Sequence, residues 1–314
     1  MAGILLAGLG CSAPEGPDAL ARAEEAALRG DWSQAAELWY GIHRAEARKS
    51  ERSYFETARA LHESGDSESA SALLERGIQE LPSSVRLREL QGELLEEAGF
   101  ERAAELVYGQ LVELDPDGAE GLVALGRVRL AVGLERSARE PLERALELQP
   151  DHAEAHLHLA LVHAGLGEDL AAYTHYVRAF DLGAGDDSLL VAAASLAMGE
   201  AVTAERPDAH RSATLWMTAV VERQPQNTAA HFLLGVHREA QGELEDARDA
   251  YLRAAETDPG CIQALTRLTR LYARLGEEAM AEHMLQRVLG LESDPERAAE
   301  LERLVRGQDL PEDP

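Results

Sequence analysis

Five histidines lie close together in the middle of the sequence, at His152, His156, His158, His163 and His175. His152 and His156 are four residues apart, a spacing that places two imidazoles on one face of a helix, as a zinc site requires. Glu154 is the nearest carboxylate, but it would leave a helix in a different direction from both histidines. A metal-dependent enzyme built on His152 to His163 is therefore one hypothesis, and histidines that pack between helices are the interpretation that the pattern favours.

No other catalytic pattern is present in the sequence. Nothing in it resembles a nucleophile elbow, a phosphate-binding loop or a zinc-protease helix. The two cysteines, Cys11 and Cys261, cannot form a disulfide framework or supply a cysteine-rich zinc site. We therefore predict no catalytic residue, no cofactor and no metal ligand.

Cys11 has a different potential chemistry, the attachment of lipid. It follows the apolar stretch from Met1 to Gly10 and precedes a polar linker, SAPEGPD. This arrangement resembles the end of a bacterial lipoprotein signal, in which the cysteine becomes the lipid-modified first residue. Gly8 stands where such signals have leucine, and no Lys or Arg precedes the apolar run. The resemblance implies a signal remnant and linker over residues 1–18 and a lipid anchor on Cys11.

Composition limits the partners and the fold class. The chain has 314 residues, and its 57 Asp and Glu against 30 Lys and Arg give a formal charge of -27, which repels phosphate backbones. We therefore expect no nucleic-acid partner. The longest apolar run, residues 1–11, is shorter than the roughly 18 residues of a spanning helix, so membrane contact is expected only through the lipid. Abundant Ala, Leu, Glu and Arg, with only 4% aromatic residues, predict an all-α fold.

An internal repeat of about 34 residues organises these helices. Glycine recurs at Gly30, Gly65, Gly99, Gly133, Gly167, Gly242 and Gly276. An alanine stands five residues after each glycine, at Ala35, Ala70, Ala104, Ala138, Ala172, Ala247 and Ala281, and Ala213 occupies the same place in a unit without the glycine. A large residue follows four positions later, at Trp39, Leu74, Tyr108, Leu142, Tyr176, Met217, Tyr251 and Leu285. Prolines end most units, at Pro82, Pro116, Pro150, Pro225 and Pro259.

Each unit of this repeat predicts a helical hairpin. The glycine separates two helices, the small alanine allows them to approach closely, and the proline ends the second helix. The pattern, with Leu125-Gly126 and Leu234-Gly235 in first helices, resembles the tetratricopeptide repeat. The resemblance implies a right-handed α-α superhelix of about eight hairpins over residues 16–49, 51–84, 85–118, 119–152, 153–186, 187–227, 228–261 and 262–295. A helical bundle is the alternative, but it needs no fixed period.

Some segments depart from the repeat. The first unit has Ala47 in place of the closing proline and Arg22 at an inward position, which predicts a capping unit. The sixth unit has extra residues, so we expect a protruding loop at 200–208. Pro141 falls inside a predicted helix, where proline costs about 3 kcal/mol or kinks the helix. We expect a capping helix over 296–307 and a disordered tail over 308–314.

The family resemblance also implies a binding surface. In this family the first helices of the hairpins line a concave groove that holds a peptide. The residues predicted to line it are Val123, Arg127, Leu157, Leu161, Val191, Ser195, Phe232 and Val236. Charged residues would stand at the ends of this groove: Glu89, Glu93 and Glu96 in the third unit, Arg52 and Arg59 in the second, and Arg267, Arg270 and Arg274 in the eighth. The carboxylate clamp of some family members is absent.

These patterns lead to three hypotheses about function. The first is a non-enzymatic scaffold that binds a protein segment, anchored by lipid in the periplasm or outer membrane and acting in assembly of the bacterial envelope. The second is a cytoplasmic adaptor with an unmodified Cys11. The third is the metal-dependent enzyme. In the family His156, His163 and His231 would occupy buried positions between helices, which favours the first two hypotheses.

Overall fold

A computed structural model describes residues 17–46, 49–199, 204, 206, 208–291, 299, 302, 303 and 305. The described residues form sixteen helices and contain no strand. The all-α prediction is therefore confirmed. None of the helices in the described part of the chain is both long enough and apolar enough to cross a membrane.

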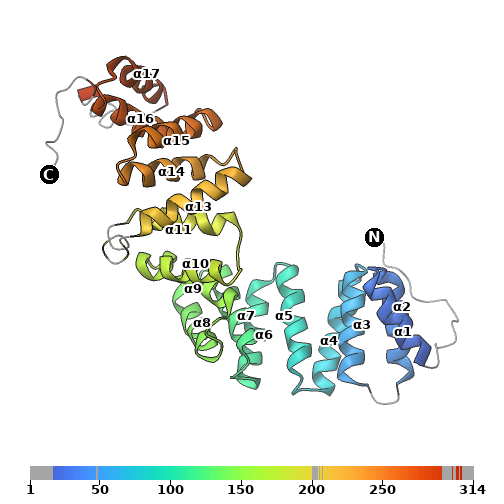
Figure 1. Ribbon diagram of the computed structural model, residues 1–314. Helices are drawn as coiled ribbons and strands as arrows, with labels where there is room; N and C mark the ends of the chain where they lie inside the picture. Colours follow the sequence, from blue (N-terminus) through green and yellow to red (C-terminus); the bar gives the residue numbers. More distant parts are fainter. Residues whose placement is uncertain are drawn as a thin grey trace. The chain divides into compact units, whose positions relative to one another are not determined.

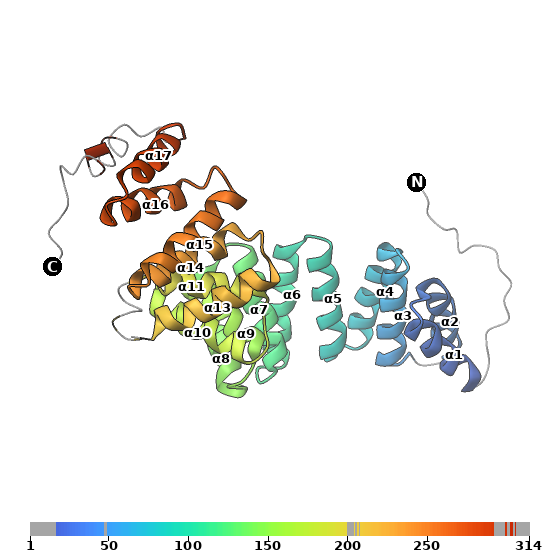
Figure 2. The same ribbon diagram turned by 45° about the horizontal axis from the view of Figure 1, so that its top comes forward.

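The chain divides into two compact units, residues 1–150 and 151–314. The helices of the first unit are α1 (Pro17–Leu28), α2 (Trp32–Ala45), α3 (Glu51–Glu63), α4 (Ser67–Glu80), α5 (Val85–Glu97), α6 (Glu101–Leu114), α7 (Ala119–Ala131) and α8 (Glu135–Leu148). Those of the second are α9 (Ala153–Gly165), α10 (Asp169–Asp181), α11 (Asp187–Leu196), α13 (Ala209–Arg223), α14 (Thr228–Ala240), α15 (Leu244–Thr257), α16 (Ile262–Arg274) and α17 (Glu278–Leu289). Within each unit the helices pack in chain order as antiparallel hairpins (Figures 1 and 2).

The repeated residues build the hairpins as their types predict. All seven repeated glycines have a positive φ, between 73° and 94°, in the turn between the two helices of a hairpin. The eight repeated alanines are completely buried, and the eight large residues that follow them are at most 5% exposed. A small residue at each close helix contact and a large one beside it therefore form the core of every hairpin.

Glycines in three first helices bring the two helices of their hairpins still closer. A Cβ atom on Gly126 of α7 would lie 2.4 Å from Leu142 of α8. Cβ atoms on Gly92 and Gly235 would lie equally close to the rings of Tyr108 and Tyr251. In these hairpins the glycine of the first helix has no side chain, and the large residue of the second helix fills the space beside it.

Pro141 lies within α8, and the helix continues on both sides of it without a break. A proline has no N–H group, so the carbonyl of Ser137, four residues earlier, receives no helical hydrogen bond from it. The guanidinium of Arg129 on α7 donates to this carbonyl instead, at 2.9 Å, and its Nε also lies 3.3 Å from a carboxylate oxygen of Glu105. The predicted cost of an internal proline is thus partly offset by a side chain of the neighbouring helix.

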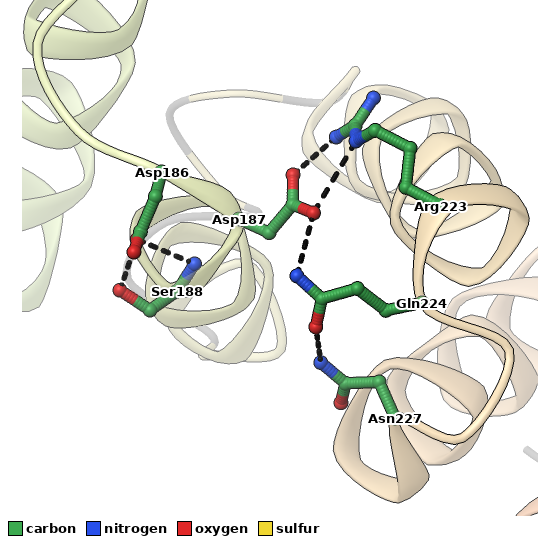
Figure 3. A network of polar contacts seen from close by, with 6 residues as sticks. All are labelled: Asp186, Asp187, Ser188, Arg223, Gln224 and Asn227. Carbon is green, nitrogen blue, oxygen red and sulfur yellow. Dashed lines mark hydrogen bonds and ion pairs between the residues drawn. The ribbon is translucent and has the colours of Figure 1, made fainter.

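A polar network joins α11 and α13, the hairpin that carries the additional residues, to the start of α14 in the next hairpin (Figure 3). Asp187 at the start of α11 forms an ion pair with Arg223 at the end of α13 and accepts a hydrogen bond from Gln224 at 2.8 Å. Asn227 donates to Gln224 at 3.0 Å, and its side-chain oxygen also accepts from the N–H of Ala230 to cap α14. This network fixes the end of α13 to the start of α11, despite the long connection between the two helices.

Several predicted features fall outside the described residues. These are Cys11 with the rest of residues 1–16, Ala47, most of the predicted 200–208 loop, and the 308–314 tail. Only a few positions of the predicted 296–307 helix are described, and among these Val305 packs against the core around α16 and α17.

Candidate protein-binding face

Five of the residues predicted to line a groove lie on the first helices of the second unit and retain exposed surface. Leu157 and Leu161 are one turn apart on α9, and Leu161 is 43% exposed. Val191 and Ser195 occupy the same positions of α11, Val191 half-buried and Ser195 exposed, and Phe232 is half-buried on α14. We call these residues, Leu157, Leu161, Val191, Ser195 and Phe232, the first-helix strip.

The half-buried members of the first-helix strip are held by the core beneath them. Leu157 packs against the cluster that contains Ala160 and Tyr176, and Val191 against the cluster that contains Met217. Phe232 packs against the clusters on both sides of α14, and its ring centroid lies 5.9 Å from that of Tyr251. Each of these side chains therefore has a fixed position while part of its apolar surface still meets solvent.

Two other predicted lining residues are buried, and for these the structure corrects the prediction. Val236 is only 8% exposed because it belongs to the core cluster between α14 and the following hairpin. Val123 is 2% exposed, since α7 buries apolar residues around most of its circumference. Neither side chain presents a surface to a ligand in this structure.

Arg127, the remaining predicted lining residue, is half-buried on α7 in the first unit. Its Nη1 lies 2.7 Å from the carboxylate of Glu96 on α5, which also accepts a hydrogen bond from the hydroxyl of Tyr108 at 2.7 Å. Glu89, on the same helix as Glu96, is half-buried, and its pKa is raised, first by this burial and then by neighbouring carboxylates such as Glu93. Glu89, Glu93 and Glu96 thus lie together on α5, and the last of them is paired with Arg127 of α7.

The arrangement around Glu96 occurs a second time, at α14 and α15. Glu239 accepts a hydrogen bond from the Tyr251 hydroxyl at 2.7 Å, and the hydrogen bond and burial together raise the pKa of this tyrosine, with burial the larger cause. We did not identify either glutamate as the partner of a tyrosine from the sequence. The available signal was the spacing: in both hairpins a glutamate precedes the repeated tyrosine by twelve residues.

Three of the clustered histidines meet in the structure. Nδ1 of His156 and Nδ1 of His175 are 2.9 Å apart, and the rings of His163 and His175 stack at a centroid distance of 5.2 Å. His163 is buried, with its Nδ1 at 2.6 Å from a carboxylate oxygen of Glu168. Burial, reinforced by the two neighbouring histidines, lowers the pKa of His175 to about 4. These three rings pack against one another between α9 and α10.

The other clustered histidines lie elsewhere. Nδ1 of His152 accepts from the N–H of Ala155 at 3.3 Å and so caps α9, and Nε2 of His158 lies 3.4 Å from Glu154. Across the part of the chain that the structure describes, no three His, Cys, Asp or Glu side chains are placed to hold a metal ion. The pair His152 and His156, which suggested a zinc site, is therefore divided between a helix cap and a ring cluster.

His231, predicted to be buried, is only half-buried, and its Nε2 lies 3.0 Å from the carbonyl of Pro225. The fully buried histidine of α14 is instead His237. Its Nε2 donates to the carbonyl of Ala194 on α11 at 2.8 Å, and its Nδ1 lies 2.8 Å from Nδ1 of His210 on α13. The repeat does not predict this pair, because His237 lies outside the positions that recur in the 34-residue pattern.

Comparison with known proteins agrees with this architecture. A sequence profile of the tetratricopeptide repeat matches residues 123–187 and 207–260. The solved structure of YrrB, a tetratricopeptide repeat protein with an unusual peptide-binding site, is similar to this chain with a TM-score of 0.55. This chain has the tetratricopeptide repeat fold.

Identities between the tetratricopeptide structures and this chain are low, so the likeness shows the fold alone. YrrB is 19% identical, and the match covers 62% of this chain and 97% of YrrB. A tetratricopeptide repeat protein from Parabacteroides merdae is 15% identical with a TM-score of 0.53, and that match covers 92% of this chain and 98% of the other. The long second match extends the tetratricopeptide likeness beyond the residues that the sequence profile covers.

Proposed function

We propose that this tetratricopeptide protein is a non-enzymatic scaffold that binds a segment of another protein on the first-helix strip. The observation that carries the proposal is the partial exposure of apolar side chains at matching positions of three successive first helices, α9, α11 and α14. Apolar surface that recurs in this way along one set of helices is typical of a protein interaction site. Proteins of this fold generally bind protein or peptide partners, and YrrB is described as having a peptide-binding site.

The construction of the first-helix strip suits recognition of a peptide. Because Leu157, Val191 and Phe232 are packed against the core, binding would order few additional side chains. A low loss of side-chain entropy leaves more of the burial energy available for affinity. Leu161 is the most exposed apolar member of the strip, so its burial by a partner would remove the most apolar surface from water.

The test uses a peptide selected by phage display on the wild-type chain. We expect Leu161→Ala to weaken binding of this peptide by about 5- to 30-fold, which corresponds to about 1 to 2 kcal/mol, with an unchanged melting temperature. Leu215→Ala is the matched control, because Leu215 is 67% exposed but lies on α13, a second helix. Calorimetric titration of both variants measures the difference. Weaker binding by Leu215→Ala alone would reject the first-helix strip.

Phe232 is less suitable for this test than Leu161. Its ring packs against the core on both sides of α14, so truncation to alanine would also lower stability. Its contribution to affinity is better measured with Phe232→Leu, which retains most of the apolar volume.

We further propose that Cys11 carries lipid and holds the scaffold at a bacterial membrane, in assembly of the cell envelope. The support is the sequence pattern, an apolar run that ends directly before this cysteine and a polar linker after it. Expressed in a bacterium behind a complete lipoprotein signal, the chain should incorporate labelled palmitate and sediment with membranes. Cys11→Ala should remain unlabelled in the supernatant. Equal partitioning of the two forms would favour the cytoplasmic adaptor.

A further inference from the structure

The last described hairpin presents a row of arginines on its first helix, α16. Arg267, Arg270 and Arg274 are separated by three and four residues, so they lie on one face of the helix. Leu265 and Leu268, on the other side of α16, are buried in the core, and the arginine side chains lie outside it.

Glu239 of α14 forms ion pairs with two of these arginines. Nη1 of Arg267 lies 3.5 Å from one carboxylate oxygen of Glu239, and Nη1 of Arg274 lies 3.7 Å from the other. The same carboxylate accepts the hydroxyl hydrogen bond of Tyr251 at 2.7 Å. The side chains of Arg267 and Arg274 remain 41% and 49% exposed. Two guanidinium groups thus share one carboxylate at long distances and retain donors that face solvent.

The arginine row lies near Phe232, the last residue of the first-helix strip. Phe232 packs against the core cluster of α16, and its ring contacts that of Tyr251, whose hydroxyl reaches Glu239. Phe232 and Glu239 are seven residues apart on α14, so they lie on the same face of that helix. A partner seated on Phe232 would therefore have the guanidinium groups of α16 within reach.

We propose that this part of the protein binds an acidic segment of a partner protein, with carboxylates on the arginine row and an apolar side chain on Phe232. Guanidinium and carboxylate groups form strong, charge-assisted hydrogen bonds, which would be added to the shared contact with Glu239. The net charge of the rest of the chain repels acidic ligands, so only a segment whose carboxylates match the row would be held. This proposal rests on the proposed function and specifies the partner of the strip.

The experiment measures fluorescence anisotropy of three labelled peptides with the full chain. Each peptide has about twelve residues and alternates leucine with Glu, Gln or Lys. We expect the Glu peptide to bind about tenfold more tightly than the Gln peptide at low salt, and the Lys peptide to bind more weakly than both. The advantage of the Glu peptide should decrease as salt is raised, because exposed charges are screened.

Arginine variants then locate the site. Arg267→Gln with Arg274→Gln, and separately Arg270→Gln, should each weaken binding of the Glu peptide by about fivefold to tenfold and leave binding of the Gln peptide unchanged. Arg253→Gln is the control, because Arg253 is 70% exposed on α15, a second helix. A melting curve for each variant verifies that it is folded.

Three outcomes would overturn the proposal. The first is equal affinity for the Glu and Gln peptides, and the second is an equal loss of binding in Arg253→Gln. The third is equally tight, Arg270-dependent binding of a single-stranded oligonucleotide with the same charge, which would indicate general anion binding. If the Gln peptide binds and Leu161→Ala weakens it while the arginine variants have no effect, the proposed function stands and this inference fails. If phage display selects no peptide and none of the three labelled peptides binds, both fail.

Discussion

Replacing Tyr251 with alanine is expected to lower the free energy of unfolding by about 3 to 5 kcal/mol. The side chain is completely buried, its ring fills the space left by Gly235, and its hydroxyl donates to Glu239. Alanine would leave a cavity between α14 and α15 and would deprive Glu239 of its hydrogen bond from within the hairpin. Urea unfolding followed by circular dichroism measures the loss.

Two control variants separate the contributions of Tyr251. Tyr251→Phe retains the ring and removes only the hydroxyl, so we expect a loss of about 0.5 to 1.5 kcal/mol. Tyr40→Ala removes a tyrosine that is 38% exposed on α2 and should have a much smaller effect than Tyr251→Ala. If Tyr251→Ala and Tyr40→Ala lowered the free energy of unfolding equally, that result would contradict the close contact between α14 and α15.

The stability of the chain is expected to decrease as the pH falls from 6.5 to about 4, in part because of His237. Burial, opposed by the hydrogen bond to Ala194 and reinforced by His210, lowers the pKa of His237 from 6.5 to about 4. Above pH 6.5 the residue is neutral in both states. Between the two pKa values the unfolded chain binds a proton that the folded chain does not, so folding loses up to about 3 kcal/mol.

Glutamine at position 237 tests this effect, because its amide can still donate to the Ala194 carbonyl but does not titrate. Unfolding free energies of His237→Gln should decrease less steeply between pH 6.5 and 4 than those of the wild-type chain. His231→Gln serves as the control, since His231 is half-buried on the same helix. Parallel pH profiles for the wild-type chain and His237→Gln would contradict the assignment.

The hairpins could be predicted from the sequence because each depends on contacts among residues of one repeat. A glycine with positive φ, an alanine at the contact and a large residue one turn later are local requirements, and the structure meets them in every hairpin that carries the three residues. Contacts between neighbouring hairpins were harder to predict from the sequence. Val236 was expected to face a ligand and is buried by the following hairpin.

The sequence predicts which helix positions line the candidate site, but it does not predict how far each side chain is exposed. The spacing along α9, α11 and α14 located the first-helix strip, since side chains four residues apart share a helix face. How far each side chain is exposed depends on the neighbouring helices, so Leu161 and Val236 could not be distinguished in advance. The shared position of Arg267 and Arg274 on Glu239 likewise needs the relative placement of α14 and α16.

Pro141 and Arg129 have a consequence for how this sequence can change over time. Loss of Arg129 alone would leave the exposed Ser137 carbonyl without the protein donor that now serves it, at a cost of about 0.5 to 1.5 kcal/mol. Replacement of Pro141 by an ordinary helix-forming residue would restore a backbone donor to that carbonyl and remove its need for Arg129. Substitution at the two positions therefore has a preferred order, in which the proline is replaced first and the arginine becomes free to vary only afterwards.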